Sequence, residues 1–167
     1  MKLSEGVEWG IHCAVLLAGL EPGAALPGKA LAEYHGVSES YLLKHLKALT
    51  AAELLVSLPG PRGGYRLARP PERITLLDVV QAIDGTEPAF RCTEIRQRGP
   101  LALEARAYRR PCSINAAMLR AENAWRAELK RTSLADIVSE VVATADPRVM
   151  ARSAGWLECN SRSAQRG

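Results

Sequence analysis

Two side chains near the start of the chain could bind a metal ion together. Glu8 and His12 are four residues apart in a segment with helical periodicity, so one helix face presents both, one turn apart. A carboxylate and an imidazole at this spacing can chelate one metal ion. The same spacing is also common for a solvated surface pair, and a histidine among apolar residues is often a core residue. The residues alone therefore leave a metal site and an ordinary helix surface both open.

Two cysteines are the other candidates for ligand chemistry. Cys92 and Cys112 enclose a segment without cysteine or histidine, and their wide separation is not the spacing of a zinc ribbon or a ferredoxin. Arg91 and Arg110 are close to them in the sequence and favour the thiolate, which is the metal-binding form of cysteine. Inert buried thiols are the other interpretation. The four cysteines of the chain are too dispersed to predict a disulfide framework.

Composition limits the class of protein. The chain has 167 residues, of which 47% are hydrophobic and 24% charged, as in a globular protein of one domain or slightly more. The longest apolar segment, residues 11–20, is too short for a membrane span, and Glu5 and Glu8 are acidic where a secretion signal would not be. We therefore expect a cytoplasmic protein with no membrane partner.

The net charge is +4, and basic residues gather between positions 41 and 73, which favours nucleic acid as a partner.

The apolar periodicity predicts a mainly α-helical chain with one small β-hairpin. The ranges expected for helices are 4–20, 27–36, 38–52, 75–85, 113–131 and 133–142, and the strands 54–58 and 65–68 flank a turn at 59–64. The predicted units are a DNA-binding domain (1–85), a long loop (86–112), a pair of helices (113–145) and a flexible tail (146–167).

This order of elements is that of a winged helix-turn-helix, in which the helix from Ser38 is the recognition helix. The first turn of such a helix reaches base edges, lysines further along suit phosphates, and the tip of the wing enters a minor groove. The residues that we expect to contact DNA are Ser38, Ser40, Tyr41, Lys44, Lys47 and Arg62. A helix pair followed by a hairpin also occurs in proteins that bind no DNA.

Several segments resemble one family of bacterial regulators. They are Leu31-Ala32-Glu33, residues 37–49, the wing segment 63–70 with its Gly-Gly-Tyr sequence, and the segment 74–85 with its Ile-Thr-Leu start. Over about residues 1–130 the chain resembles the IscR/NsrR-type winged-helix iron–sulfur transcription regulators. The resemblance implies a homodimer that binds a roughly palindromic DNA operator. It also implies a long dimerisation helix at about Ser113–Arg131 and a cluster-binding loop at residues 86–112.

The loop departs from the pattern of that family in one respect. Typical members have three regularly spaced loop cysteines, whereas here Arg98 and Glu104 stand where the second and third would be. The segment 92–101, the opening residues 6–9 and His12 resemble instead the RsrR-type branch, whose two loop cysteines are widely spaced. That branch implies a sensor of redox state.

The resemblance implies a [2Fe-2S] cluster with mixed ligands. Such a cluster needs two protein ligands for each iron, and Cys92 with Cys112 can serve one iron while Glu8 with His12 serves the other. We expect one cluster per protomer, with ligands shared between the loop of one chain and the first helix of its partner. Imidazole in place of thiolate raises the reduction potential, as in Rieske centres, so mild reductants should reduce the cluster. Trp9, beside Glu8, is a candidate for gating the cluster.

Other interpretations stay open at this point. Glu5, Glu94 or water could replace Glu8 as a ligand, and zinc could occupy the same four-ligand site. A metal-free or thiol-based winged-helix regulator would use the loop cysteines as thiols or not at all. We do not expect an enzyme, because no third orienting residue and no oxyanion-hole glycine turn accompanies either loop cysteine.

Overall fold

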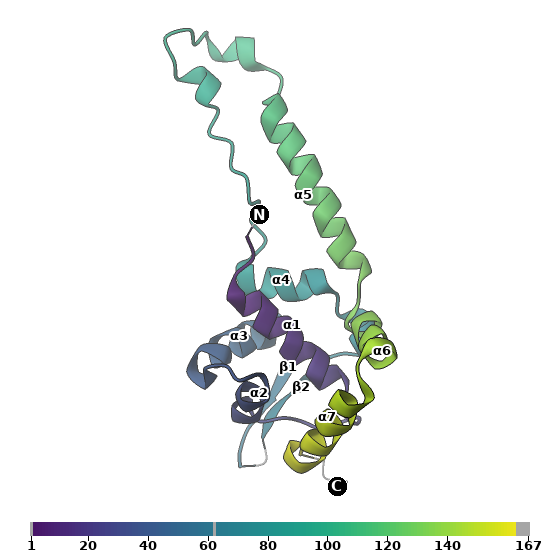
Figure 1. Cartoon of the computed structure of the whole chain (residues 1–167). Helices are drawn as coiled ribbons and strands as arrows, with labels where there is room; N and C mark the ends of the chain where they lie inside the picture. The colour runs from purple at the N-terminus through teal and green to yellow at the C-terminus, as the bar shows by residue number, and fades with distance from the viewer. Residues whose placement is uncertain (1, 62, 163–167) are drawn as a thin grey trace.

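The computed structural model describes residues 2–61 and 63–162, and its elements follow the order expected for a winged helix (Figure 1). The fold class is confirmed as mainly helical with a small two-stranded hairpin. The elements are α1 (Glu5–Ala18), α2 (Gly28–His35), α3 (Glu39–Ala51), β1 (Leu55–Leu58), β2 (Gly64–Leu67), η1 (Pro71–Arg73), α4 (Leu76–Asp84), η2 (Ile95–Gln97), η3 (Ala105–Tyr108), α5 (Ser113–Arg131), α6 (Leu134–Thr144) and α7 (Pro147–Asn160).

The core lies where α1 and α3 pack against each other and against α4. Leu42, Leu46 and Leu49 of α3 recur at helical spacing and are completely buried, as their periodicity predicts. The opposite face of α3 is exposed to solvent. The helix thus has one face that holds it in the domain and another that is free to meet a partner.

Two glycines let α1 approach its neighbours closely. A Cβ added at Gly6 would lie 2.1 Å from Cε1 of the buried His45 ring, and one at Gly10 would lie 2.4 Å from Cδ1 of Ile83. Both distances are far shorter than a van der Waals contact, so the packing of α1 on α3 and α4 requires glycine at these positions. This close packing fixes where the exposed face of α1, with Glu8 and His12, lies relative to the recognition helix.

We expect Gly6→Ala to lower the free energy of unfolding by up to about 2 kcal/mol. Overpacking a core costs about 1–3 kcal/mol, and the better helix propensity of alanine offsets about 1 kcal/mol of that cost. Gly155→Ala is the matched control, because Gly155 lies in α7 with nothing within 4 Å of the added Cβ. This control should be neutral or stabilising by about 1 kcal/mol. Urea unfolding at one protein concentration measures both, and equal effects would contradict the packing argument.

The wing is a tight antiparallel hairpin. β1 and β2 pair from Leu55 opposite Leu67 to Leu58 opposite Gly64. The turn between them admits no side chain at Gly63, where a Cβ would lie 2.0 Å from the carbonyl oxygen of Leu58. Beyond the hairpin, Leu26 forms an isolated antiparallel bridge with Tyr65 of β2. The wing is therefore joined to the helical body through the segment that precedes α2.

The second half of the chain forms an arm. Figure 1 shows α5 leading away from the helical body, with residues 86–112 running beside it and turning back at its far end. Ile114 and Met118 on α5 are exposed in the single chain, 65% and 44% respectively. After α5 the chain returns, and α6 packs on α1 with Leu134 completely buried. None of the helices within the described ranges is both long enough and apolar enough to cross a bilayer.

The prediction of a flexible tail from residue 146 is wrong for residues 147–160, which form α7. The side chain of Asp146 caps this helix by accepting a hydrogen bond from the Arg148 backbone N–H, and Pro147 occupies its first turn. Trp156 and Leu157 of α7 pack against the core. Ser161 and Arg162 follow α7 within the described residues, and residues 163–167 of the expected tail lie outside them.

Candidate functional site

The exposed face of α3 carries the residues expected to contact DNA. Ser38 is the N-cap residue of α3, and its hydroxyl lies 3.1 Å from that of Ser40 in the first turn. Tyr41 is 44% exposed, and the side chains of Lys44 and Lys47 are also exposed. These five residues therefore lie on the surface of one helix, as a DNA-reading helix requires. The sixth, Arg62 of the wing turn, lies outside the described residues.

An aromatic cluster joins this helix to α1. The rings of Trp9 and Tyr41 meet edge to face with centroids 5.3 Å apart, and His45 packs edge to face on both. Burial lowers the pKa of His45, and the charge of Lys44 lowers it further, while Asp84 opposes the shift. These effects favour the neutral form of His45, which packs between α3 and α1. Trp9, which follows Glu8 in the sequence, therefore contacts Tyr41, a candidate DNA-contacting residue, directly.

The two candidate ligands on α1 are both accessible from solvent. Glu8 and His12 lie on the solvent side of the helix, whereas Cys13, next to His12, is completely buried. The ring of His12 lies 5.7 Å from that of His35 in α2. Burial raises the pKa of the Cys13 thiol to about 12, as is typical of a structural thiol. Glu8 and His12 are thus free to bind something outside their own chain.

The structure brings Cys92 and Cys112 together. Their side chains are close enough for Cys92 to lower the pKa of the Cys112 thiol, although the two residues are far apart in the sequence. Cys112 is the N-cap residue of α5, and the backbone N–H groups of Asn115 and Ile114 lower the pKa of its thiol. Two thiolate ligands of one iron would need to be neighbours, as these two side chains are.

The far end of the loop is held by hydrogen bonds that cross it. Arg96 donates to the carboxylate of Glu94 at 2.6 Å and to the backbone carbonyl of Arg110 at 2.7 Å. The hydroxyl of Tyr108 donates to the carbonyl of Arg96, and the guanidinium of Arg96 lies over the Tyr108 ring. The Arg96 guanidinium and the backbone N–H of Cys112 lower the pKa of the Glu94 carboxylate. Glu94 is therefore engaged in bracing the loop, which favours Glu8 as the carboxylate ligand.

The near end of the loop is fixed to α5 by a buried carboxylate. Glu122 is only 8% exposed, and it accepts hydrogen bonds from Arg126 at 2.7 Å and from the backbone N–H of Ala89 at 2.9 Å. Arg126 also donates to the carbonyl of Thr86. These residues were not identified from the sequence. The four-residue spacing of Glu122 and Arg126 is a usable sequence signal for their ion pair. Their contacts with residues 86–89 are long-range, and nothing in the sequence indicates them.

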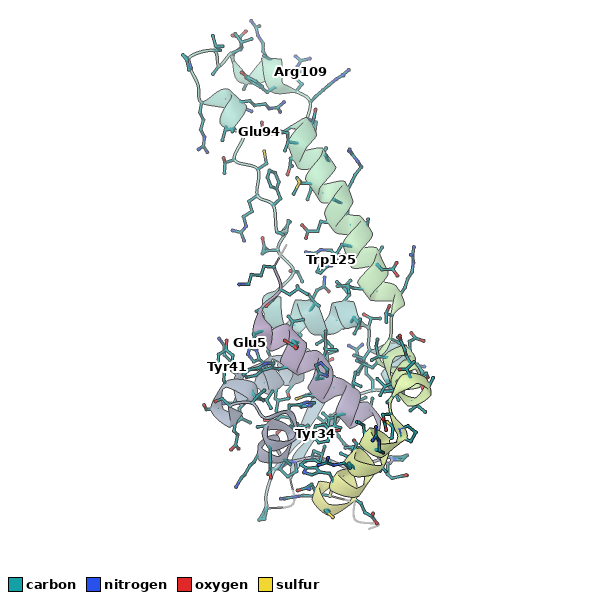
Figure 2. The ribbon with its side chains drawn as sticks, in the orientation of Figure 1. Glu5, Tyr34, Tyr41, Glu94, Arg109 and Trp125 are labelled. Atoms are coloured by element: carbon teal, nitrogen blue, oxygen red, sulfur yellow. The ribbon has the colours of Figure 1, made fainter. Side chains whose placement is uncertain are left out.

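The two pairs of candidate ligands do not meet within one chain. In the part of the chain that the structure describes, no group of three or more histidine, cysteine, aspartate and glutamate side chains could hold a metal ion. Figure 2 shows Glu94, a neighbour of the cysteine pair, at the far end of α5 from Trp125, whereas Glu5 lies on α1 in the helical body. A four-ligand site built from these residues therefore needs a second chain.

Comparisons with known proteins identify the family. The model of the Rrf2 family, described as an iron-dependent transcriptional regulator, matches residues 3–140. An HTH-type transcriptional regulator of Bacillus subtilis, YwgB, is 31% identical over 141 residues, which are 84% of this chain and 86% of the relative. Another from Lactococcus lactis, YffB, is 34% identical over 140 residues, covering 84% of this chain and 88% of the relative.

Solved structures show the same fold. CymR, the global cysteine regulator of B. subtilis, superposes with a TM-score of 0.66 at 24% identity, covering 84% of this chain and 98% of CymR. IscR of T. potens superposes with a TM-score of 0.65 at 22% identity, covering 90% of this chain and 96% of IscR. From the family match and the curated relatives, we conclude that the chain belongs to the Rrf2 family of DNA-binding transcription regulators.

Proposed function

We propose that this regulator is a homodimer that binds a roughly palindromic operator in the cytoplasm and senses redox state through a [2Fe-2S] cluster. Cys92 and Cys112 of one chain and Glu8 and His12 of its partner would hold the cluster, one for each protomer. The observation that carries the proposal is the pairing of the two thiols at the end of the arm. The accessible pair on α1 supplies the remaining ligand types.

The donor set suits such a cluster. Thiolates are the usual ligands of iron–sulfur clusters, and imidazole in place of thiolate raises the potential, as in Rieske centres. When bound, the cluster would supply a one-electron redox change at the dimer interface. Glu8 and His12 would report that change to α1, and His12 could take up the accompanying proton. Trp9 would link α1 to the recognition helix, because it contacts Tyr41 of α3.

The first experiment is a visible absorption spectrum of anaerobically purified protein, with iron and sulfide analysis. We expect visible bands that bleach on mild reduction, and about two irons and two sulfides for each chain. Zinc without sulfide, or a protein that stays colourless after cluster reconstitution, would contradict the proposal.

A metal-free, thiol-based regulator is the second candidate. The proximity of Cys92 to the Cys112 thiol favours it too, since an oxidant can convert two neighbouring thiols into a disulfide. A colourless protein that binds its operator with unchanged affinity after strictly anaerobic purification would favour this candidate over the cluster.

For DNA recognition we propose that Ser38, Ser40 and Tyr41 reach base edges, while Lys44 and Lys47 contact phosphates. Two-fold symmetry of the dimer places the two recognition helices on two half-sites. The wing turn, with Arg62, would contact the adjacent minor groove.

We expect Lys44→Gln to weaken DNA binding by a similar factor for all sequences. It should also reduce the slope of log K against log salt by about 1 for each phosphate that Lys44 neutralises. Lys130→Gln is the control, because it removes the same charge from a position on α5, away from α3. Fluorescence anisotropy at several salt concentrations, with a duplex selected by the wild-type protein from a random library, measures the slope. An unchanged slope for Lys44→Gln would remove Lys44 from the interface.

A further inference from the structure

The helix α7, which the sequence did not predict, packs on the helix-turn-helix. The hydroxyls of Tyr34 in α2 and Ser153 in α7 lie 2.6 Å apart, and the rings of Tyr34 and Trp156 meet with centroids 5.0 Å apart. Figure 2 shows Tyr34 on the side of the body where α7 lies. The C-terminal helix is therefore anchored to the first helix of the DNA-binding motif.

The chain beyond α7 is hydrogen-bonded to the strand-like segment that also holds the wing. The backbone N–H of Arg162 donates to the carbonyl of Ala25 at 2.9 Å, and the N–H of Ala25 donates to the carbonyl of Arg162 at 3.0 Å. The next residue, Leu26, makes the same kind of pair with Tyr65 of β2. Residues 25–26 thus lie between the wing and the C-terminal segment in one short ladder.

The side chain of Arg162 then reaches the wing itself. Its guanidinium donates a hydrogen bond to the backbone carbonyl of Pro61, in the turn that joins β1 to β2. A two-stranded hairpin with strands this short is marginally stable alone, so interactions outside the hairpin decide how firmly its turn is held. The guanidinium is a charged donor, and charge-assisted hydrogen bonds are stronger than neutral ones.

We propose that α7 and Arg162 form a C-terminal clamp that positions the wing turn for DNA. α7 anchors the segment on α2, the Arg162–Ala25 pair aligns it, and the Arg162 guanidinium holds the Pro61 carbonyl. Arg162 is a positioning residue, since it acts on the wing and not on DNA. A turn already held in place loses less conformational freedom on binding than a mobile one, and affinity rises accordingly. The functional consequence rests on the proposed wing contact with DNA.

Arg162→Gln tests the clamp with two measurements. In the free protein, hydrogen exchange of the peptide that contains the wing turn should become faster, while exchange in α3 and α4 stays unchanged. The affinity of the variant for the DNA duplex that the wild-type protein selects from a random library should fall about tenfold. This is the effect of removing one charge-assisted hydrogen bond. Arg148→Gln is the control, because the guanidinium of Arg148 pairs with Asp146 at the opposite end of α7.

The outcomes separate the clamp from its alternatives. Unchanged exchange in the wing would overturn the clamp, and if affinity nevertheless fell, Arg162 would be contacting DNA directly. Faster exchange with unchanged affinity would overturn the functional part of the inference. Arg62→Gln tests the wing contact separately from the clamp. If this variant binds DNA as tightly as the wild-type protein does, the proposed wing contact itself is contradicted.

Discussion

Anaerobically purified Cys112→Ala protein should be colourless and contain no sulfide, whereas we expect the wild-type protein to be coloured. One iron of the proposed cluster has only Cys92 and Cys112 as ligands, so removing either thiolate leaves it with a single protein ligand. Cys92→Ala should have the same effect. Both thiols lie in a loop away from the helical core, so neither substitution creates a cavity in the folded body.

Cys159→Ala is the matched control for these two variants. Cys159 is an exposed cysteine of α7, and its replacement should leave absorbance, iron and sulfide unchanged. Circular dichroism and gel filtration verify that all three variants are folded and have the same oligomeric state. Colour that survives in both loop variants would show that other residues hold the cluster.

The sequence was sufficient to predict the helix-turn-helix and the wing, because strong local signals mark these elements. Thr75 caps α4, and its hydroxyl accepts a hydrogen bond from the Asp78 N–H in a capping box, a motif that is readable from the sequence. The α7 helix was missed because the whole segment from residue 146 onward is rich in serine and arginine. Its start has a readable signal in Asp146-Pro147, but much of its support comes from tertiary packing of Trp156 and Leu157.

The loop could be predicted only in part. Its prolines indicate an irregular segment, but no signal marks the two short 3-10 helices, Ile95–Gln97 and Ala105–Tyr108, that interrupt it. The hydrogen bond from Arg96 to the Arg110 carbonyl closes the loop and keeps the cysteines close. Such an interaction between irregular segments leaves no periodicity in the sequence, so the resemblance to a family was needed to pair the cysteines.

Mixed dimers should distinguish ligands shared between chains from ligands within one chain. We expect Glu8→Ala/His12→Ala protein and Cys92→Ala/Cys112→Ala protein to be colourless separately, because each lacks half of every site. If ligands are shared between chains, the heterodimer has one intact site. In that site the loop of the first variant, which keeps both cysteines, meets α1 of the second variant, which keeps Glu8 and His12. The other site then lacks all four ligands. Random reassortment of two equal populations makes about half of the dimers mixed, so the mixture should recover about one quarter of the wild-type cluster.

The structure makes this the decisive comparison for the ligand set, since the two halves lie on separate parts of one chain. The variants should be mixed under conditions that exchange subunits and then reconstituted with iron and sulfide. Each variant treated alone is the control and should stay colourless. Recovery of colour near one quarter supports sharing across the interface. If the mixture stays colourless although exchange of differently tagged subunits is complete, the ligands are not shared. If Glu8→Ala/His12→Ala protein is coloured by itself, the α1 pair does not hold the cluster.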